Sequence, residues 1–248
     1  MGFTQAPLTY IFALVAGTLP SAAWLWYWIK EDDVTKPPMG LVALTFVTGM
    51  IMVIVVIPLE KYMGTIFTDP TTQIVVWATC EEILKYGAFM LIATASNYVE
   101  EPIDYPIYAM TAALGFAALE NTLYLVKPVA LSQTTVTLLT SNLRFLGSTL
   151  LHSVTTGFIG LMVGLAFFQD EFLRFCSLII GFILAIGLHS VFNFFIMKNN
   201  GDNFLQVFAV LWVVSIISIL VFEKVRRMSV LYYEQQIRNH HKDAVAVS

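Results

Sequence analysis

Two acids and a lysine stand together inside an apolar stretch of the chain. Glu81 and Glu82 are followed by Lys85 within residues 72–95, although a charged side chain at the centre of a membrane helix costs about 2.5–3.5 kcal/mol on insertion scales. Because an α-helix turns by about 100° per residue, Lys85 lies between the two carboxylates. The lysine can neutralise one carboxylate, and the other is poised to act as a general acid or base. A structural ion pair is the alternative.

Three later apolar stretches also carry polar side chains. A lone histidine in a membrane helix is commonly a packing residue, whereas two histidines with three carboxylates favour a chemical site. The candidates are Glu120 and Asn121 in residues 105–126, Arg144 and His152 in residues 143–168, and His189 and Asn193 in residues 173–197.

The depth of these residues indicates a common site. The chain reverses direction at every span, and four candidates fall about 6–9 residues from the same face, roughly 9–13 Å at 1.5 Å per residue. They are Glu81, Glu120, His152 and His189. We therefore expect one polar layer that crosses four helices.

Such a layer can support hydrolysis. A carboxylate deprotonates a water molecule, and histidine and asparagine donors stabilise the oxyanion that forms on the attacked carbonyl. Two histidines with a carboxylate also suit a catalytic zinc ion, for which Glu120, His152 and His189 are the candidate ligands. The sequence contains no HExxH pattern, so spacing does not select between these schemes. Cys80 beside Glu81 is interpreted as a packing residue, with a nucleophilic role left open.

Composition places this chemistry in a membrane. Of the 248 residues, 58% are hydrophobic and 12% are charged, against about 25% charged residues in soluble domains. The 13 basic and 17 acidic residues give a formal net charge of −4, which excludes a basic surface for nucleic-acid phosphates. Cys80 and Cys176 fall in different apolar stretches, so no disulfide framework is expected.

Apolar stretches of about 20 residues each predict an all-α, polytopic membrane helix bundle with about seven transmembrane helices. Acidic residues, prolines and glycines punctuate the connectors. We expect a transmembrane domain over residues 1–223 and a basic cytoplasmic tail over residues 224–248. The stretches are residues 7–29, 39–59, 72–95, 105–126, 143–168, 173–197 and 204–222.

Most lysines and arginines fall on the side of this layout that holds the C-terminal tail. Cytoplasmic loops of membrane proteins carry an excess of these residues. We therefore expect a multi-pass protein of the cell membrane with its N-terminus outside and its C-terminus in the cytoplasm. The polar layer then lies in the outer half of the bilayer.

The motifs around the candidate residues resemble those of a known family. Glu81-Glu82-x-x-Lys85 matches an EExxK motif, Phe116-x-x-x-Glu120-Asn121 matches FxxxE(N), and His189-x-x-x-Asn193 matches HxxxN. The segment from Arg144 to His152 and the first span continue the likeness, which runs in order from about residue 19 to about residue 195. The chain resembles the PrsW family of intramembrane proteases, glutamic-type relatives of the CAAX-prenyl endopeptidases.

This resemblance implies hydrolysis of a peptide bond in or near the transmembrane segment of a membrane-tethered protein, such as an anti-sigma factor. The implied partners are that substrate and the lipid bilayer. Glu81 would activate the water, with Glu82 and Lys85 as its electrostatic setting. Asn121 and Arg144 would support the site. This scheme requires no cofactor, and a divalent metal such as zinc is the alternative.

The resemblance also implies roles for the other candidates. Glu120 and His152 would transfer protons or bind the metal. His189 and Asn193 would donate hydrogen bonds to the oxyanion.

Two other functions use the same residue types. Buried glutamate, histidine and lysine residues also relay protons in a proton- or cation-coupled transporter. A metal-dependent lipid hydrolase is the second alternative.

Overall fold

The protein is an all-helical bundle, described here by a computed structural model that covers residues 5–32, 36–96, 98–131, 133, 147–198 and 204–247. These residues form helices and contain no strand, which confirms the predicted fold class. The helices are α1 (Gln5–Lys30), α2 (Met39–Ile66), α3 (Pro70–Ala95), α4 (Asp104–Ala130), α6 (Thr149–Leu165), α7 (Glu171–Lys198) and α8 (Phe204–Val247).

Five of these helices, α1, α2, α4, α7 and α8, are long and apolar enough to cross a membrane. The other two belong to the same bundle but differ in composition or length. α3 carries Glu81, Glu82 and Lys85 near its middle, and α6 is an apolar helix of 17 residues. Length and composition therefore fit a multi-pass membrane protein whose two exceptional helices both hold candidate site residues.

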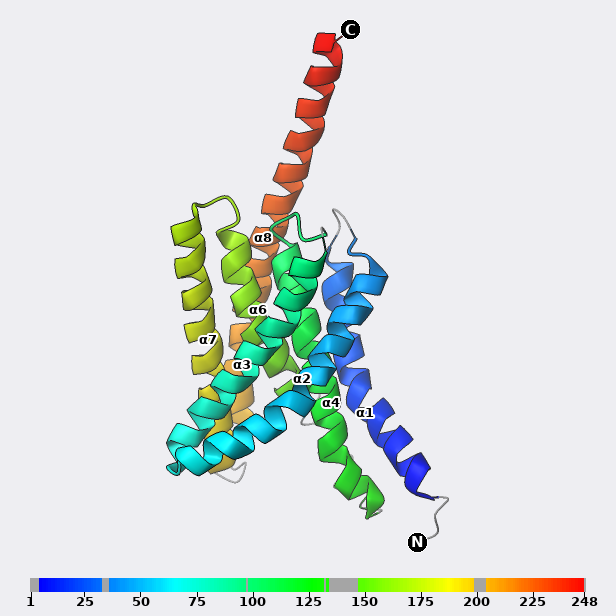
Figure 1. Ribbon diagram of the computed structural model, residues 1–248, viewed down its shortest axis with the longest axis vertical. Coiled ribbons are helices and arrows are strands. Elements are labelled where there is room, and N and C mark those ends of the chain that lie inside the picture. Colours follow the sequence, from blue (N-terminus) through cyan, green and yellow to red (C-terminus); the bar gives the residue numbers. More distant parts are fainter. Residues whose placement is uncertain are drawn as a thin grey trace.

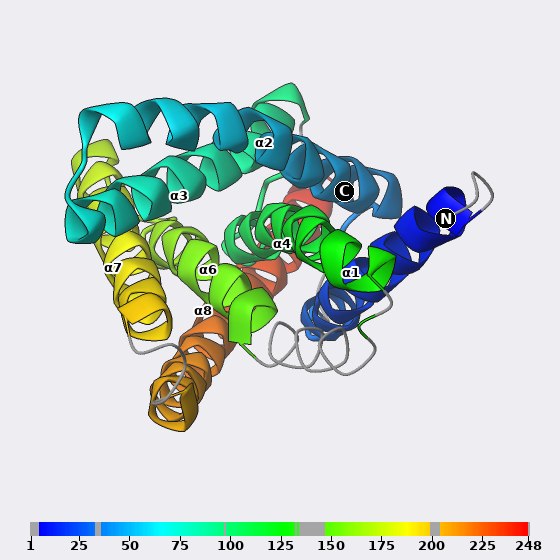
Figure 2. The same ribbon diagram turned by 90° about the horizontal axis from the view of Figure 1, so that it is seen from below.

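α4 is the core of the bundle, with α1, α2 and α6 packed around it (Figure 2). In its most apolar window 72% of the residues are buried, against 22–28% for the other four spans. The exposed faces of those four spans carry large apolar side chains, as contact with lipid requires. Polar groups on α4 and on the helix faces that meet it are consequently shielded from lipid.

Small residues allow α2 to cross α4 closely. A Cβ atom added at Gly49 would collide with the backbone oxygen of Ala112, and one added at Gly115 would collide with that of Phe46. Close approach through small residues is the common way that membrane helices associate. This crossing fixes the position of α2 against the helix that carries Glu120.

The hairpin between α2 and α3 reaches the lower end of the bundle (Figure 1). α2 runs to Ile66, seven residues past the predicted end of the span at residue 59. α3 begins after Asp69, whose carboxylate accepts hydrogen bonds of 2.8 Å from both the backbone nitrogen and the hydroxyl of Thr72. These bonds cap the helix and hold the pKa of Asp69 below its usual range.

α8 continues beyond the rest of the bundle (Figure 1). Its 44 residues correspond to about 66 Å at 1.5 Å per residue. The predicted division between residues 1–223 and a basic tail falls inside this continuous helix. The start of α1 and the end of α8 lie at opposite ends of the long axis, as an odd number of crossings requires.

Candidate active site

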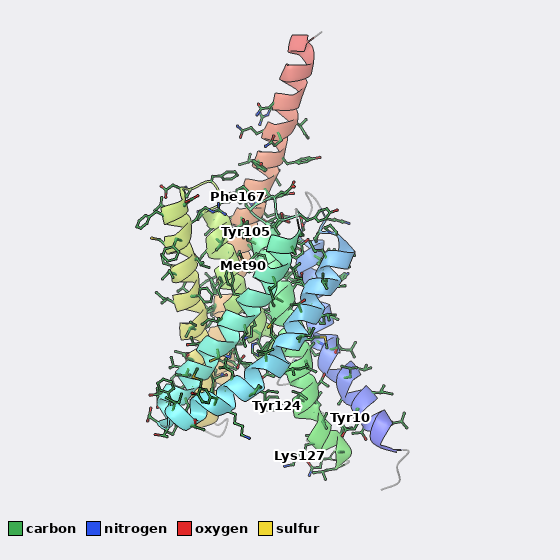
Figure 3. The ribbon with its side chains drawn as sticks, viewed as in Figure 1. Tyr10, Met90, Tyr105, Tyr124, Lys127 and Phe167 are labelled. Carbon is green, nitrogen blue, oxygen red and sulfur yellow. The ribbon has the colours of Figure 1, made fainter. Side chains whose placement is uncertain are left out.

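Six candidate residues from four helices meet inside the bundle. All are buried except Glu120, whose side chain is 22% exposed. Glu120 precedes Tyr124 by one helical turn, and Figure 3 places Tyr124 and Lys127 at the same end of the bundle as Tyr10 near the start of α1. The cluster therefore lies towards that end. Its members are Glu81, Glu82 and Lys85 of α3, Glu120 of α4, His152 of α6 and His189 of α7.

Glu82 is surrounded by hydrogen-bond donors. Its Oε1 accepts from Lys85 Nζ at 2.9 Å, from Thr155 Oγ1 at 3.0 Å and from His189 Nδ1 at 2.8 Å. Its Oε2 accepts from Thr156 Oγ1 at 2.7 Å. An ionised carboxylate has two acceptor oxygens, and both oxygens of Glu82 accept hydrogen bonds from the protein. Because this side chain is also fully buried, Glu82 is a fixed anion within the bundle.

Lys85 supplies the cation at the centre of the cluster. Besides Glu82, its ammonium lies 3.1 Å from Glu81 Oε2 and 2.7 Å from His152 Nδ1. The ammonium also lies 4.6 Å from the centroid of the Phe116 ring, in a cation–π contact. A buried lysine remains charged only when paired in this way. Lys85 therefore links the two carboxylates of α3 to the histidine of α6.

Each histidine of the cluster has a carboxylate on one ring nitrogen. His152 Nε2 lies 2.9 Å from Glu120 Oε2, and His189 Nδ1 lies 2.8 Å from Glu82 Oε1. A neutral imidazole donates from one nitrogen and accepts at the other. The carboxylates therefore fix the protons on His152 Nε2 and His189 Nδ1, and they leave lone pairs on His152 Nδ1 and His189 Nε2.

The ring nitrogens that carry these lone pairs both face the carboxylate of Glu81. His152 Nδ1 lies 3.8 Å and His189 Nε2 lies 3.9 Å from Glu81 Oε2. Among the residues that the structure describes, this buried oxygen has no hydrogen-bond partner, and its contact with Lys85 is an ion pair. Glu81, unlike Glu82, has an acceptor site free for water.

These three donors fit a divalent metal ion. The ligand atoms of Glu81, His152 and His189 all lie within 4.8 Å of one another, and a carboxylate behind each ligating histidine is typical of zinc sites. This set differs from the predicted one because Glu120 contacts the outer nitrogen of His152 and Glu81 takes its place. Lys85 contacts two of the three donors, so its ammonium and a metal ion would compete for them.

The remaining predicted residues lie around the cluster. Asn193 follows His189 by one turn of α7 and is half-buried. Asn121 is buried and donates a 2.8 Å hydrogen bond from Nδ2 to Thr149 Oγ1, which ties α4 to the start of α6. Arg144 lies outside the described residues.

Sequence reasoning missed two contributions to the site. Glu60 falls just outside the predicted span of residues 39–59, but α2 extends past it and brings its side chain near that of Glu81. Thr155 and Thr156 lie in the predicted span of residues 143–168, and no role was predicted for them. Threonines are common in membrane helices, so nothing in the local sequence distinguishes two that bind a carboxylate on another helix.

Comparison with known proteins assigns the family. The model of a family described as PrsW family intramembrane metalloprotease matches residues 37–220. The chain belongs to the PrsW family. All eight residues of the EExxK, FxxxE(N) and HxxxN motifs fall within the matched range. The family makes this protein a membrane-embedded peptidase, as its sequence motifs predict.

Curated relatives agree with this assignment. Protease PrsW of Geobacillus kaustophilus is 27% identical over 191 residues, 75% of this chain and 81% of the relative. Protease PrsW of Oceanobacillus iheyensis is 28% identical over 187 residues, 73% of this chain and 81% of the relative. The match to Protease PrsW of Bacillus subtilis is shorter, 27% identity over 124 residues and 55% of that protein. No solved structure matches the chain.

Proposed function

We propose that this intramembrane protease cleaves a peptide bond in or near the transmembrane segment of a membrane-anchored protein, with Glu81 as the residue that activates water. One observation carries the choice of Glu81. Its Oε2 is the buried carboxylate oxygen that faces the lone pairs of both His152 and His189. Glu82 differs because both of its carboxylate oxygens accept hydrogen bonds from the protein.

In this scheme Glu81 takes a proton from a water molecule held between its carboxylate and the two imidazoles. The resulting hydroxide attacks the carbonyl carbon, and the carbonyl oxygen becomes an oxyanion. As the carbon–nitrogen bond breaks, Glu81 returns the proton to the leaving amine. The products are an acid and an amine, and Glu81 is again a carboxylate.

The donors to the oxyanion follow from the histidine tautomers. His189 was a predicted donor, but its proton lies on Nδ1 and is directed to Glu82, so donation from Nε2 would require a second proton. Asn193 and Lys85 carry donors without that requirement. We therefore propose them for the oxyanion and propose that His189 Nε2 accepts a hydrogen bond from the water, since the lone pair of His152 Nδ1 already faces the ammonium of Lys85 at 2.7 Å.

The protein provides its own cation at this site. The ammonium of Lys85 lies close to two of the three oxygen and nitrogen donors, and this contact supports a reaction that runs without a metal. A divalent ion bound by Glu81, His152 and His189 would lower the pKa of a coordinated water and polarise the carbonyl. Lys85 would then have to move away from those donors.

The proposed substrate is a single-span membrane protein such as an anti-sigma factor. The PrsW family supports this class of substrate, since its members are intramembrane proteases. The carbonyl oxygens of a helix are already hydrogen-bonded, so the substrate helix must unwind at the cleaved bond. We propose that this occurs in the outer half of the bilayer, with the N-terminus outside the cell, on the distribution of lysine and arginine.

Proteoliposomes containing the full-length protein and a single-span reporter with a tag at each end test this function. We expect two tagged fragments, cleavage that persists after treatment with a chelator, and less than stoichiometric metal by elemental analysis. Loss of cleavage in chelator, with recovery when zinc is added, would refute the metal-free scheme and support a zinc-dependent one. Absence of fragments together with a proton flux would favour a transporter.

Cys80 provides a matched control for the nature of the nucleophile. Its side chain packs with Val53, Val56 and Phe116, so Cys80→Ala should leave the cleavage rate within about threefold of wild type, since no proton or bond is transferred at Cys80 in this scheme. A loss of about a hundredfold or more in this variant would indicate a covalent thioester route.

A further inference from the structure

Several described threonines of the helices hydrogen-bond to the backbone of their own helix. The hydroxyls of Thr45, Thr79 and Thr111 each donate to the backbone oxygen four residues earlier, at 2.7–2.8 Å. This is the usual solution for a hydroxyl in an apolar environment, since that oxygen is always within reach. A threonine that does otherwise has a stronger acceptor nearby.

Thr155 and Thr156 are such exceptions. Their hydroxyls donate to Glu82 Oε1 at 3.0 Å and to Glu82 Oε2 at 2.7 Å, across 73 and 74 residues of sequence. Both threonines and Glu82 are fully buried. One hydroxyl on each oxygen holds the carboxylate against α6 and fixes the rotation of its plane.

The orientation of Glu82 determines that of His189. Glu82 Oε1 accepts the proton of His189 Nδ1 at 2.8 Å, and the opposite nitrogen, Nε2, is the one that faces Glu81 at 3.9 Å. If the carboxylate rotates, His189 loses the acceptor that selects its tautomer. The imidazole then presents an N–H group to Glu81 in part of the molecules.

We propose that Thr155 and Thr156 are positioning residues that act through Glu82 to hold His189 in the tautomer with a lone pair on Nε2. This inference deepens the proposed function and rests on it for its consequence in catalysis. Thr156 has the larger effect, because the hydroxyl of Thr155 also lies 3.3 Å from the backbone oxygen of His152. Neither threonine touches the reacting atoms.

The decisive variant is Thr156→Val, which removes the hydroxyl and keeps the shape of the side chain. Loss of a group that orients a site histidine typically lowers activity about 10–100-fold. We expect a fall of this size in kcat for the tagged reporter, with KM unchanged within about twofold, and we expect Thr156→Ser to restore activity. Thr155→Val should lower kcat by a smaller factor, about 3–10-fold, because the hydroxyl of Thr155 is shared between Glu82 and the backbone oxygen of His152.

Nitrogen NMR of the chelator-treated protein in nanodiscs, labelled with 15N histidine, measures the tautomer without any substrate. The wild type should show His189, assigned with a His189→Gln variant, bearing its proton on Nδ1 alone. Thr156→Val should show both tautomers, and Thr156→Ser only the first. Thr111→Val, which removes an equally buried hydroxyl from a helix-internal bond, should change neither the spectrum nor kcat.

These readouts separate the two proposals. If Thr156→Val keeps a single His189 tautomer and a kcat within twofold of wild type, the positioning role is refuted while the protease function stands. If the wild type cleaves no substrate but the tautomer still depends on Thr156, the proposed function fails and the positioning role stands. If Thr156→Val does not fold, Thr155→Val must show the tautomer change, and its absence there refutes the proposal.

Discussion

Glu81 and Glu82 are neighbours on one helix, yet they lie in opposite environments. Glu82 has no exposed side-chain surface and is bound by four donors from three helices. The side chain of Glu81 is 11% exposed, and its Oε2 faces two imidazole lone pairs without a hydrogen-bond partner among the described residues. The first carboxylate is committed to structure, whereas the second retains an acceptor site for chemistry.

The difference arises because a helix turns by about 100° per residue. That rotation directs Glu82 towards the hydroxyls of α6 and directs Glu81 towards the ring nitrogens of His152 and His189. Identical side chains therefore acquire different roles from the helices they face. The same amide substitution at each position should separate a chemical defect from a structural one.

Glu81→Gln should have the largest effect on cleavage. Loss of the general base should lower kcat about 10²–10⁴-fold, while the melting temperature changes little, because Lys85 keeps its ion pair with Glu82. Cleavage of the tagged reporter and thermal unfolding in the same detergent measure the two effects. A variant that cleaves within tenfold of wild type would rule out Glu81 as the base.

Glu82→Gln should instead destabilise the fold. Removing one partner of a buried ion pair costs about 3–5 kcal/mol, and an amide would also place N–H groups among donors that need an acceptor. We expect a melting temperature clearly below that of Glu81→Gln, which is the matched control. Equal melting temperatures for the two variants would remove the structural distinction between the two glutamates.

Glu120→Ala should have a smaller effect, confined to catalysis. Glu120 orients His152 through the ring nitrogen that points away from Glu81, and loss of such a partner lowers activity about 10–100-fold. Its side chain is 22% exposed, so the fold should lose little stability. Glu120→Gln should retain more activity, because its amide oxygen still accepts from His152 Nε2. Wild-type kcat in the alanine variant would show that Glu120 has no such role.

The membership of the cluster could be predicted because charge in a membrane helix is costly. An apolar stretch is interrupted at each of Glu81, Lys85, His152 and His189. The depth of each residue below the membrane face can be counted from the nearer end of its stretch. Their pairing could not be predicted in the same way. The contacts of Glu82 with Thr155 and His189 depend on helix rotation and tilt, which apolar periodicity leaves undefined when the whole span is apolar.

The ends of helices show the same limit. α2 runs past its predicted end and brings Glu60 to the site, because Glu60 and Lys61 follow the apolar residues without a break in helix geometry. The division at residue 223 falls within α8 for the same reason. Hydropathy reports where a helix leaves the hydrocarbon, and a helix often continues into the aqueous region beyond.

The sequence by itself determined that this protein is a membrane helix bundle with ionisable groups at one depth, since hydrophobicity and charge act locally along the chain. Only the tertiary structure decided which carboxylate has both oxygens hydrogen-bonded and which has an oxygen without a hydrogen bond among the described residues. That outcome depends on which donors from distant helices reach each oxygen, and hydrogen bonds form only over about 3 Å.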